Sequence, residues 1–159
     1  MPESHIACLR RTGPYGEANG IQMERLKSWA AAHDLLRADS AVLGIARDDP
    51  ARTPPHACRY DTCLVLPKDT EDTEDTGDLG DLGDGDGPGS EVRVDRLAGG
   101  LHAVLTVAHT AEGLAQAWAR LFDRLAAQGL VFDDTRPVVE RYRPDLLARH
   151  LCEICVPVR

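Results

Sequence analysis

A glutamate in the middle of a short predicted strand is the residue of this sequence best placed to do chemistry. Glu140 lies within residues 138–143 (VVERYR), and strand alternation puts it on the same face as Val138 and Tyr142. A carboxylate in this position is costly to bury unless it is paired or used. It could attract a cationic aromatic ligand, or it could take a proton as a general base.

Two environments for Glu140 are consistent with the sequence. If its side chain points to bulk water, it is an ordinary surface acid. If it points into a groove between two halves of the fold, aromatic side chains surround it, and the candidates are Tyr15, Trp118, Phe122 and Tyr142. His109, which stands between a predicted strand and a predicted helix, has either a capping or solvent-exposed role or a place among these ligand-binding residues.

Other chemical signatures are absent from the sequence. It contains no GxxxxGK, no glycine-rich dinucleotide fingerprint, no HExxH and no GxSxG, so no cofactor is expected. The five cysteines are an odd number without an export signal, which predicts reduced thiols rather than disulfides. Cys58 and Cys63, like Cys152 and Cys155, fall in predicted strands at odd separations that place the partners on opposite faces. No metal site is therefore predicted.

Nine segments must position these residues. Strands are predicted at residues 4–12, 41–47, 58–66, 91–96, 101–108, 138–143 and 150–158, and helices at about 21–33 and 111–128. The strand at 91–96 is expected at a sheet edge. The remaining segments follow the order strand, helix, strand, strand twice.

The recurrence of this order indicates an internal duplication. Residues 43–50 (LGIARDDP) align with residues 137–144 (PVVERYRP), with matching prolines at their ends. Each half is too small to bury its own apolar face. We therefore predict an α+β fold in which tandem βαββ repeats, at about 4–67 and 91–158, form one curved sheet. Both helices are expected on one face, with a ligand groove between the repeats.

The formal charge of −8 is concentrated in one segment. Residues 69–90 contain nine carboxylates and no Lys or Arg, so the rest of the chain has 17 acidic and 18 basic residues. A nearly neutral body argues against a nucleic-acid surface. The acidic segment is rich in Gly and does not match a calcium-binding loop, so we predict a solvated, flexible insertion.

The amino-terminal residues and the hydropathy pattern predict the location. No apolar run approaches the roughly 20 residues needed to cross a bilayer, so no membrane contact is expected. Residues 1–11 do not form a signal peptide, so a cytoplasmic location is expected.

The sequence resembles the GyrI-like family over nearly its whole length apart from the acidic segment. That family includes SbmC-type gyrase inhibitors and the effector-binding domains of AraC-type and multidrug-sensing regulators. The resemblance is carried by Gly13-Pro14-Tyr15, the helix around Trp29, DDP at 48–50, CRYDTC at 58–63, LAGGLHAV at 97–104, His109, AWARLF at 117–122, VERY at 139–142 and VPV at 156–158.

The resemblance implies a role for Glu140. It maps the central glutamate of the family onto Glu140, where it meets cationic or polar aromatic effectors. Some standalone members are hydrolases that open cyclopropane-bearing natural products. By analogy with them, Glu140 would deprotonate water, and Tyr142 or Tyr15 would be the nearby phenol. The chain departs from the pattern at residues 110–112, which replace the Gly-Pro-Tyr-like stretch of the first repeat.

We therefore expect a standalone module, without a helix-turn-helix, that senses or sequesters small hydrophobic compounds, cationic aromatic ones among them. One alternative is a hydrolase with Glu140 as general base. Another is an inhibitor of DNA gyrase that acts by protein contact, with gyrase or a regulator as its partner rather than nucleic acid.

Overall fold

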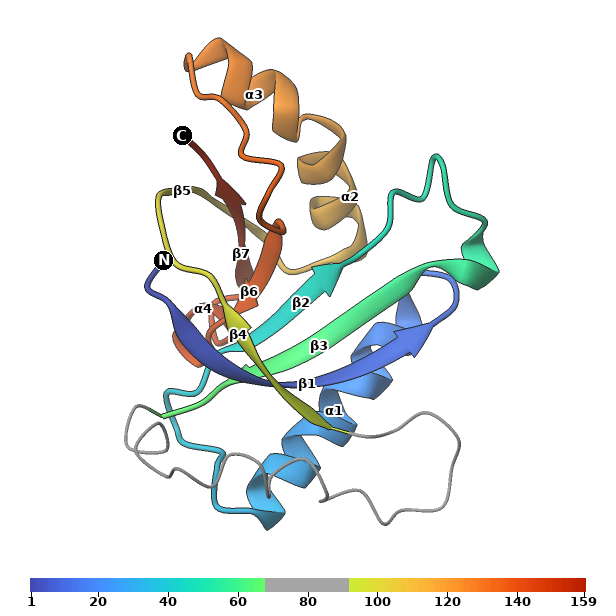
Figure 1. Cartoon of the computed structure of the whole chain (residues 1–159), viewed down its shortest axis with the longest axis vertical. Coiled ribbons are helices and arrows are strands. Elements are labelled where there is room, and N and C mark those ends of the chain that lie inside the picture. Colours follow the sequence, from blue (N-terminus) through green and yellow to red (C-terminus); the bar gives the residue numbers. More distant parts are fainter. Residues whose placement is uncertain (68–91) are drawn as a thin grey trace.

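The computed structural model describes residues 1–67 and 92–159 and has an α+β fold built on one curved, antiparallel sheet (Figure 1). The predicted acidic insertion at 69–90 lies outside the described residues. The elements in chain order are β1 (Ser4–Thr12), α1 (Glu17–Ala32), β2 (Val42–Ala46), the 3₁₀ turn η1 (Pro55–Ala57), β3 (Arg59–Val65), β4 (Arg93–Leu97), β5 (His102–Ala108), α2 (Ala111–Ala119), α3 (Leu121–Ala127), β6 (Val139–Tyr142), α4 (Pro144–Leu147) and β7 (Leu151–Pro157). None of the helices in these described ranges is both long and apolar enough to cross a membrane.

The strand order of the sheet reflects the predicted duplication. The order is β4-β1-β3-β2-β6-β7-β5, so each half places its second strand at the seam, then its last strand, then its first strand, and β4 is added beyond β1. The halves are joined where β2 pairs with β6, with Gly44 opposite Glu140. β4 occupies a sheet edge, as predicted, and pairs with β1 of the first half.

The helices cover one face of the sheet, which we call the helix face. Alternation along β7 shows this, because Cys152 packs with α1 residues while Ile154 and Val156 pack with α2 and α3 residues. In Figure 1, α1 passes behind β1 and β3, and α2 and α3 lie beside β6 and β7. The opposite face has its own buried cluster, which includes Leu43 and Cys155. The predicted arrangement, with one curved sheet and its helices on one face, is confirmed.

The second predicted helix is not continuous. Residues 111–128 form two helices that meet at Arg120, whose backbone angles (φ −113°, ψ 4°) leave the α region. The apolar stripe that predicted one helix continues across the break, because Ala117, Leu121 and Leu125 are all buried against the same part of the sheet. The spacing of apolar residues therefore predicts which side chains are buried, but it does not predict where the helix changes direction.

The prediction that all cysteines are reduced is wrong for two of them. Cys8 on β1 and Cys63 on β3 form a disulfide, whereas Cys58, Cys152 and Cys155 are free and buried. The antiparallel register places Cys8 directly opposite Cys63, with their Cα atoms 4.1 Å apart. Strand register depends on residues far apart in the sequence, so an odd number of cysteines does not show which two of them lie close enough to form a disulfide.

Candidate functional site

Glu140 lies at the seam between the two halves, and its side chain is on the helix face. Its cross-strand partner on β7, Ile154, packs with α2 and α3, and this identifies the face. The partly buried carboxylate accepts three hydrogen bonds. Trp118 Nε1 donates to Oε1 at 2.8 Å, and the hydroxyls of Tyr60 and Tyr142 donate to Oε2 at 2.9 and 2.8 Å. We call these four residues the Glu140 cluster.

The donors in the Glu140 cluster are all neutral. An indole N–H and two phenols satisfy the carboxylate, and within residues 1–67 and 92–159 no Lys, Arg or His forms an ion pair with it. The carboxylate of Glu140 is therefore bonded to one indole and two phenols rather than directed at bulk water, whereas the predicted groove between the halves stays a prediction. The arrangement leaves the negative charge of the carboxylate without a cationic partner inside the described part of the chain.

Burial keeps the two tyrosines of the cluster protonated. Loss of water raises the pKa of Tyr60 far above its ordinary value, and the charge of Glu140 and the hydrogen bond to it raise it further. The pKa of Tyr142 is raised in the same way, by burial first and then by the nearby Tyr60 and Glu140. Both phenols therefore act as hydrogen-bond donors to the carboxylate.

A glycine on the neighbouring strand makes room for the cluster. Gly44 of β2 lies opposite Glu140, and a Cβ added there would stand 1.9 Å from Tyr60 Oη and 3.1 Å from Glu140 Oε2. Any other side chain would displace the phenol, because the Tyr60 hydroxyl is too close to leave room for a carbon atom. The requirement for glycine in the middle of this strand comes from the close approach of the Tyr60 hydroxyl.

Two more of the predicted residues flank the cluster. The exposed ring of His109 meets Tyr142 edge-on, with the centroids 5.4 Å apart. The ring of Tyr15 lies 5.9 Å from that of Tyr60. The hydroxyl of Tyr15 is 2.9 Å from the backbone carbonyl oxygen of Asp48, so it is directed at the backbone rather than at Glu140. Between the two phenols considered for catalysis, only that of Tyr142 bonds Glu140.

Phe122 is not brought to the cluster. Its ring is 51% exposed and packs edge-on against Phe132, with the centroids 5.2 Å apart. In one continuous helix, Trp118 and Phe122 would share a face, being four residues apart. The break at Arg120 separates them, so Trp118 reaches Glu140 while Phe122 does not.

Tyr60 and Gly44 are part of the site, although the sequence patterns did not indicate them. Tyr60 lies in the predicted strand at 58–66, and alternation gives it a face but not a partner across the sheet. The pairing of β3 with β2, and of β2 with β6, brings Tyr60 to Glu140 although 80 residues separate them in sequence. The presence of a glycine inside the predicted strand at 41–47 was the available signal, since it marks a close approach.

Comparison with known proteins identifies similar sequences over the full length. A family model described as the GyrI-like small molecule binding domain matches residues 1–159. The chain is 32% identical over its whole length to the SPbeta prophage-derived YosT of Bacillus subtilis (strain 168), which is named as a transcriptional regulator and is 95% covered. It is 33% identical over 97% of its length to a protein of Edwardsiella piscicida named DNA gyrase inhibitor, which is 91% covered.

Solved structures share the fold at low sequence identity. The EcmrR C-terminal domain matches all of this chain and 93% of its own, with a TM-score of 0.66 and 12% identity. A hydrolase from Listeria innocua matches 99% of this chain and 88% of its own, with a TM-score of 0.62 and 15% identity. SAV2435, solved with tetraphenylphosphonium bound, matches all of this chain and 90% of its own, with a TM-score of 0.56 and 12% identity.

Proposed function

Because the chain belongs to the GyrI-like family of small-molecule-binding domains, we propose that it binds hydrophobic, cationic compounds at the Glu140 cluster and thereby senses or sequesters them. The fold places the cluster between the two halves of the sheet, where a ligand could contact both.

The observation that carries this proposal is a partly buried carboxylate whose bonded partners are all neutral. A carboxylate removed from water is ordinarily stabilised by a cation, because attraction between opposite charges is stronger at reduced dielectric. Glu140 instead bonds Trp118, Tyr60 and Tyr142. A bound cation would supply the missing opposite charge.

The rings around the carboxylate suit a ligand that is both apolar and positively charged. Trp118 and Tyr15 are partly buried, so each offers ring surface together with some rigidity. A cation over such a face gains about 0.5 to 2 kcal/mol, depending on how far it is desolvated. His109 is exposed next to Tyr142 and would lie at the solvent side of the ligand.

Calorimetric titration with tetraphenylphosphonium tests the proposal, with tetraphenylborate as a probe of the same shape and opposite charge. We expect the cation to bind and the anion to bind far more weakly. Glu140→Gln should weaken the cation about 5- to 30-fold, equivalent to about 1 to 2 kcal/mol. Glu112→Gln, which removes an exposed carboxylate from α2 outside the cluster, is the matched control.

Two results would contradict the proposal. One is equal affinity for the cation and the anion, which would remove the role of charge. The other is an equal loss of affinity in Glu140→Gln and Glu112→Gln, which would show that overall charge rather than the cluster decides binding.

A second candidate function is hydrolysis of a strained electrophile, and the adjacent carboxylate and phenols favour it. Glu140 would remove a proton from water, and Tyr142, whose pKa is raised by burial, would be the protonated phenol beside it. Incubation with a cyclopropane-containing compound and a mass increase of one water would support turnover. Glu140→Gln should abolish that turnover while binding survives; a mutant as fast as the parent would exclude this mechanism.

The relatives named DNA gyrase inhibitor suggest a third candidate, a contact with that enzyme. The balance of 17 acidic and 18 basic residues outside 69–90 favours a protein contact over DNA binding. A supercoiling assay with the full chain and with residues 69–90 deleted tests whether the acidic segment imitates a phosphate backbone. Undiminished inhibition by the deleted chain would exclude that imitation.

A further inference from the structure

A group of arginines lies on the sheet face opposite the Glu140 cluster. Arg10 on β1, Arg47 directly after β2 and Arg93 on β4 converge on Asp61 of β3, and we call these residues the Asp61 cluster. Asp61 pairs across the sheet with Ile45, which is buried in the cluster of the opposite face. The four side chains therefore project away from α1, α2 and α3.

The hydrogen bonds saturate Asp61 but use few donors of the arginines. The Asp61 side chain has no exposed surface. It accepts from Arg10 Nε (2.6 Å) and Nη2 (2.8 Å), Arg47 Nε (2.7 Å) and Arg93 Nη2 (3.0 Å). The arginine side chains remain 34%, 26% and 41% exposed, in that order. Each guanidinium has five N–H groups, so most donors of Arg47 and Arg93 are not used by any described residue.

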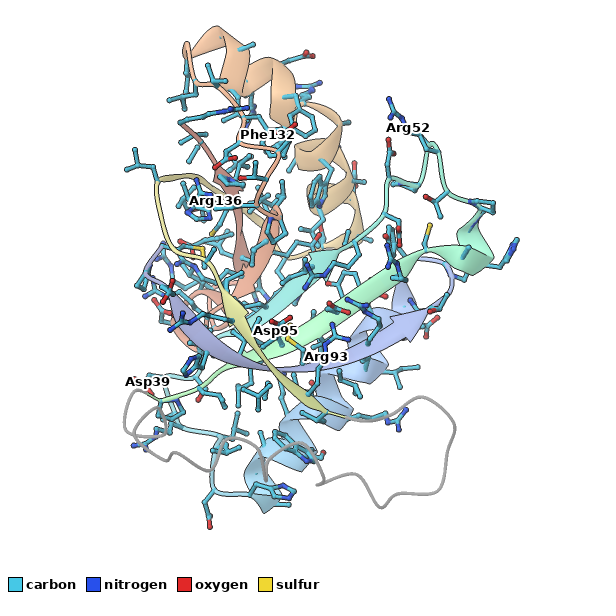
Figure 2. The ribbon with its side chains drawn as sticks, viewed as in Figure 1. Asp39, Arg52, Arg93, Asp95, Phe132 and Arg136 are labelled. Carbon is cyan, nitrogen blue, oxygen red and sulfur yellow. A yellow bond between two sulfur atoms is a disulfide. The ribbon has the colours of Figure 1, made fainter. Side chains whose placement is uncertain are left out.

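The charges of the Asp61 cluster do not balance. Three guanidinium groups face one carboxylate, which leaves two positive charges in excess. The nearby Arg59 and Asp48 form their own pair at 2.8 Å and do not change this sum. Asp95 lies on the same face of β4 as Arg93, as Figure 2 shows. Its carboxylate accepts from the backbone N–H of Arg96 and forms no ion pair with another described residue.

Stabilising Asp61 does not by itself require three arginines. A buried carboxylate needs one opposite charge together with hydrogen bonds to its remaining lone pairs, and neutral donors can supply those bonds, as they do for Glu140. Additional guanidinium groups repel one another, and the repulsion is larger where water is partly excluded. An anion placed against the outer N–H groups would relieve that repulsion.

We propose that the Asp61 cluster is an oxyanion-binding site for a phosphate or carboxylate group, separate from the cation site at Glu140. Guanidinium groups bind both oxyanions with paired N–H donors in one plane. Arg47 and Arg93 supply the outward donors, and Asp61 holds their Nε and Nη2 atoms respectively in position. A ligand with a cationic and an anionic group would need to span the sheet, so the two sites serve different molecules.

Nuclear magnetic resonance of the ¹⁵N-labelled full chain tests this site without altering it. Inorganic phosphate is titrated against the arginine Nε–H signals, with chloride keeping the ionic strength constant, and succinate is used in parallel as the carboxylate probe. We expect saturable shifts for Arg10, Arg47 and Arg93 and none for Arg124, which is exposed on α3. Arg93→Gln should weaken the anion at least 5-fold, whereas Arg124→Gln should leave its affinity unchanged.

The outcomes distinguish a specific anion-binding site from nonspecific attraction between anions and exposed arginines. Shifts that rise linearly without saturation for both probes, or that are as large at Arg124, would overturn the proposal. So would an Arg93→Gln variant with the affinity of the parent. If Arg93→Gln does not fold, as circular dichroism would show, the signals of the unaltered chain decide. Saturation with only one of the two probes supports the site and identifies which anion it prefers.

Discussion

At the scale of residues, the Glu140 cluster depends on the absence of a side chain at Gly44. Gly44 leaves the volume that the Tyr60 hydroxyl needs to reach Glu140 Oε2. The same oxygen accepts from Tyr142, and Oε1 accepts from Trp118, so three strands and α2 meet at one carboxylate. A larger residue at position 44 should therefore displace the Tyr60 hydroxyl.

We predict that Gly44→Ala lowers the free energy of unfolding by about 1 to 3 kcal/mol, the usual cost of overpacking. The added Cβ would stand 1.9 Å from Tyr60 Oη and 2.8 Å from Tyr60 Cζ. Tyr60→Phe removes the hydroxyl, so the glycine substitution should cost less in that background without becoming neutral. Urea unfolding of the four proteins of this double-mutant cycle gives the coupling energy.

Gly20→Ala is the control for Gly44→Ala, because a Cβ at Gly20 on α1 meets no atom within 4 Å. It should be neutral or stabilising by up to about 1 kcal/mol, the difference in helix propensity. Additive effects of Gly44→Ala and Tyr60→Phe would show that the two residues do not compete for this space.

At the scale of elements, one arginine joins the connection before β6 to the ends of two other strands. Arg136 donates from Nη1 to the Gly99 carbonyl oxygen at 3.0 Å, and from Nη2 to those of Leu101 and Val158 at 3.1 and 3.2 Å. Its Nε bonds Asp133 at 2.8 Å. As Figure 2 shows, Arg136 lies between the β4–β5 connection and β7, where its side chain is only 14% exposed.

We predict that Arg136→Met lowers the free energy of unfolding by about 2 to 3 kcal/mol, because the carbonyl oxygens of Gly99 and Val158 lose a donor where water is partly excluded. Arg136→Lys should recover little of this loss, since one ammonium cannot replace the planar fork. Chemical denaturation measures both. Arg124→Met, an exposed change on α3, should stay within about 0.5 kcal/mol of the parent; full recovery by lysine would contradict the role of the fork.

At the scale of the whole molecule, the partly buried Glu140 and the buried Asp61, on opposite faces of the sheet, have different hydrogen-bond donors. Glu140 on the helix face bonds neutral donors, whereas Asp61 on the opposite face bonds three arginines. Burial tends to raise the pKa of Asp61, but the hydrogen bonds from Arg10 and Arg47 outweigh it, and the pKa lies below the ordinary 3.8. Folding stability is therefore linked to this proton.

We predict that stability falls as the pH drops below about 4. The unfolded chain takes up a proton at Asp61 near the ordinary pKa of 3.8, whereas the folded chain does so only at lower pH. Acid therefore favours the unfolded state. Asp48 and Asp133, with pKa values of about 2, act in the same window and the same direction. Urea midpoints between pH 2.5 and pH 7 measure the effect.

Asp61→Asn isolates the contribution of Asp61 to this acid sensitivity. At pH 7 the variant should be less stable by about 3 kcal/mol, because three arginines lose a buried opposite charge. Its stability should then depend less on pH below 4 than that of the parent. Equal slopes in the two proteins would show that Asp61 is not linked to the acid transition.

The sequence by itself determined the local features of the fold. Alternation and helical spacing predict the seven strands and α1 to within a few residues, because each pattern depends only on which neighbouring side chains share a face. The same reasoning places Glu140 and Tyr142 on one face, and both do lie on the helix face. The matching halves predict the two-part sheet, and the strand order confirms it.

Only the tertiary structure decided which of these faces and residues meet. Strand register brings Tyr60 and Gly44 to Glu140, and it places Cys8 opposite Cys63. The break at Arg120 determines that Trp118, and not Phe122, reaches the carboxylate. Strand register and helix direction result from packing between segments far apart in the chain. The alternation within a strand is the same whichever strand it pairs with, so it cannot predict that partner.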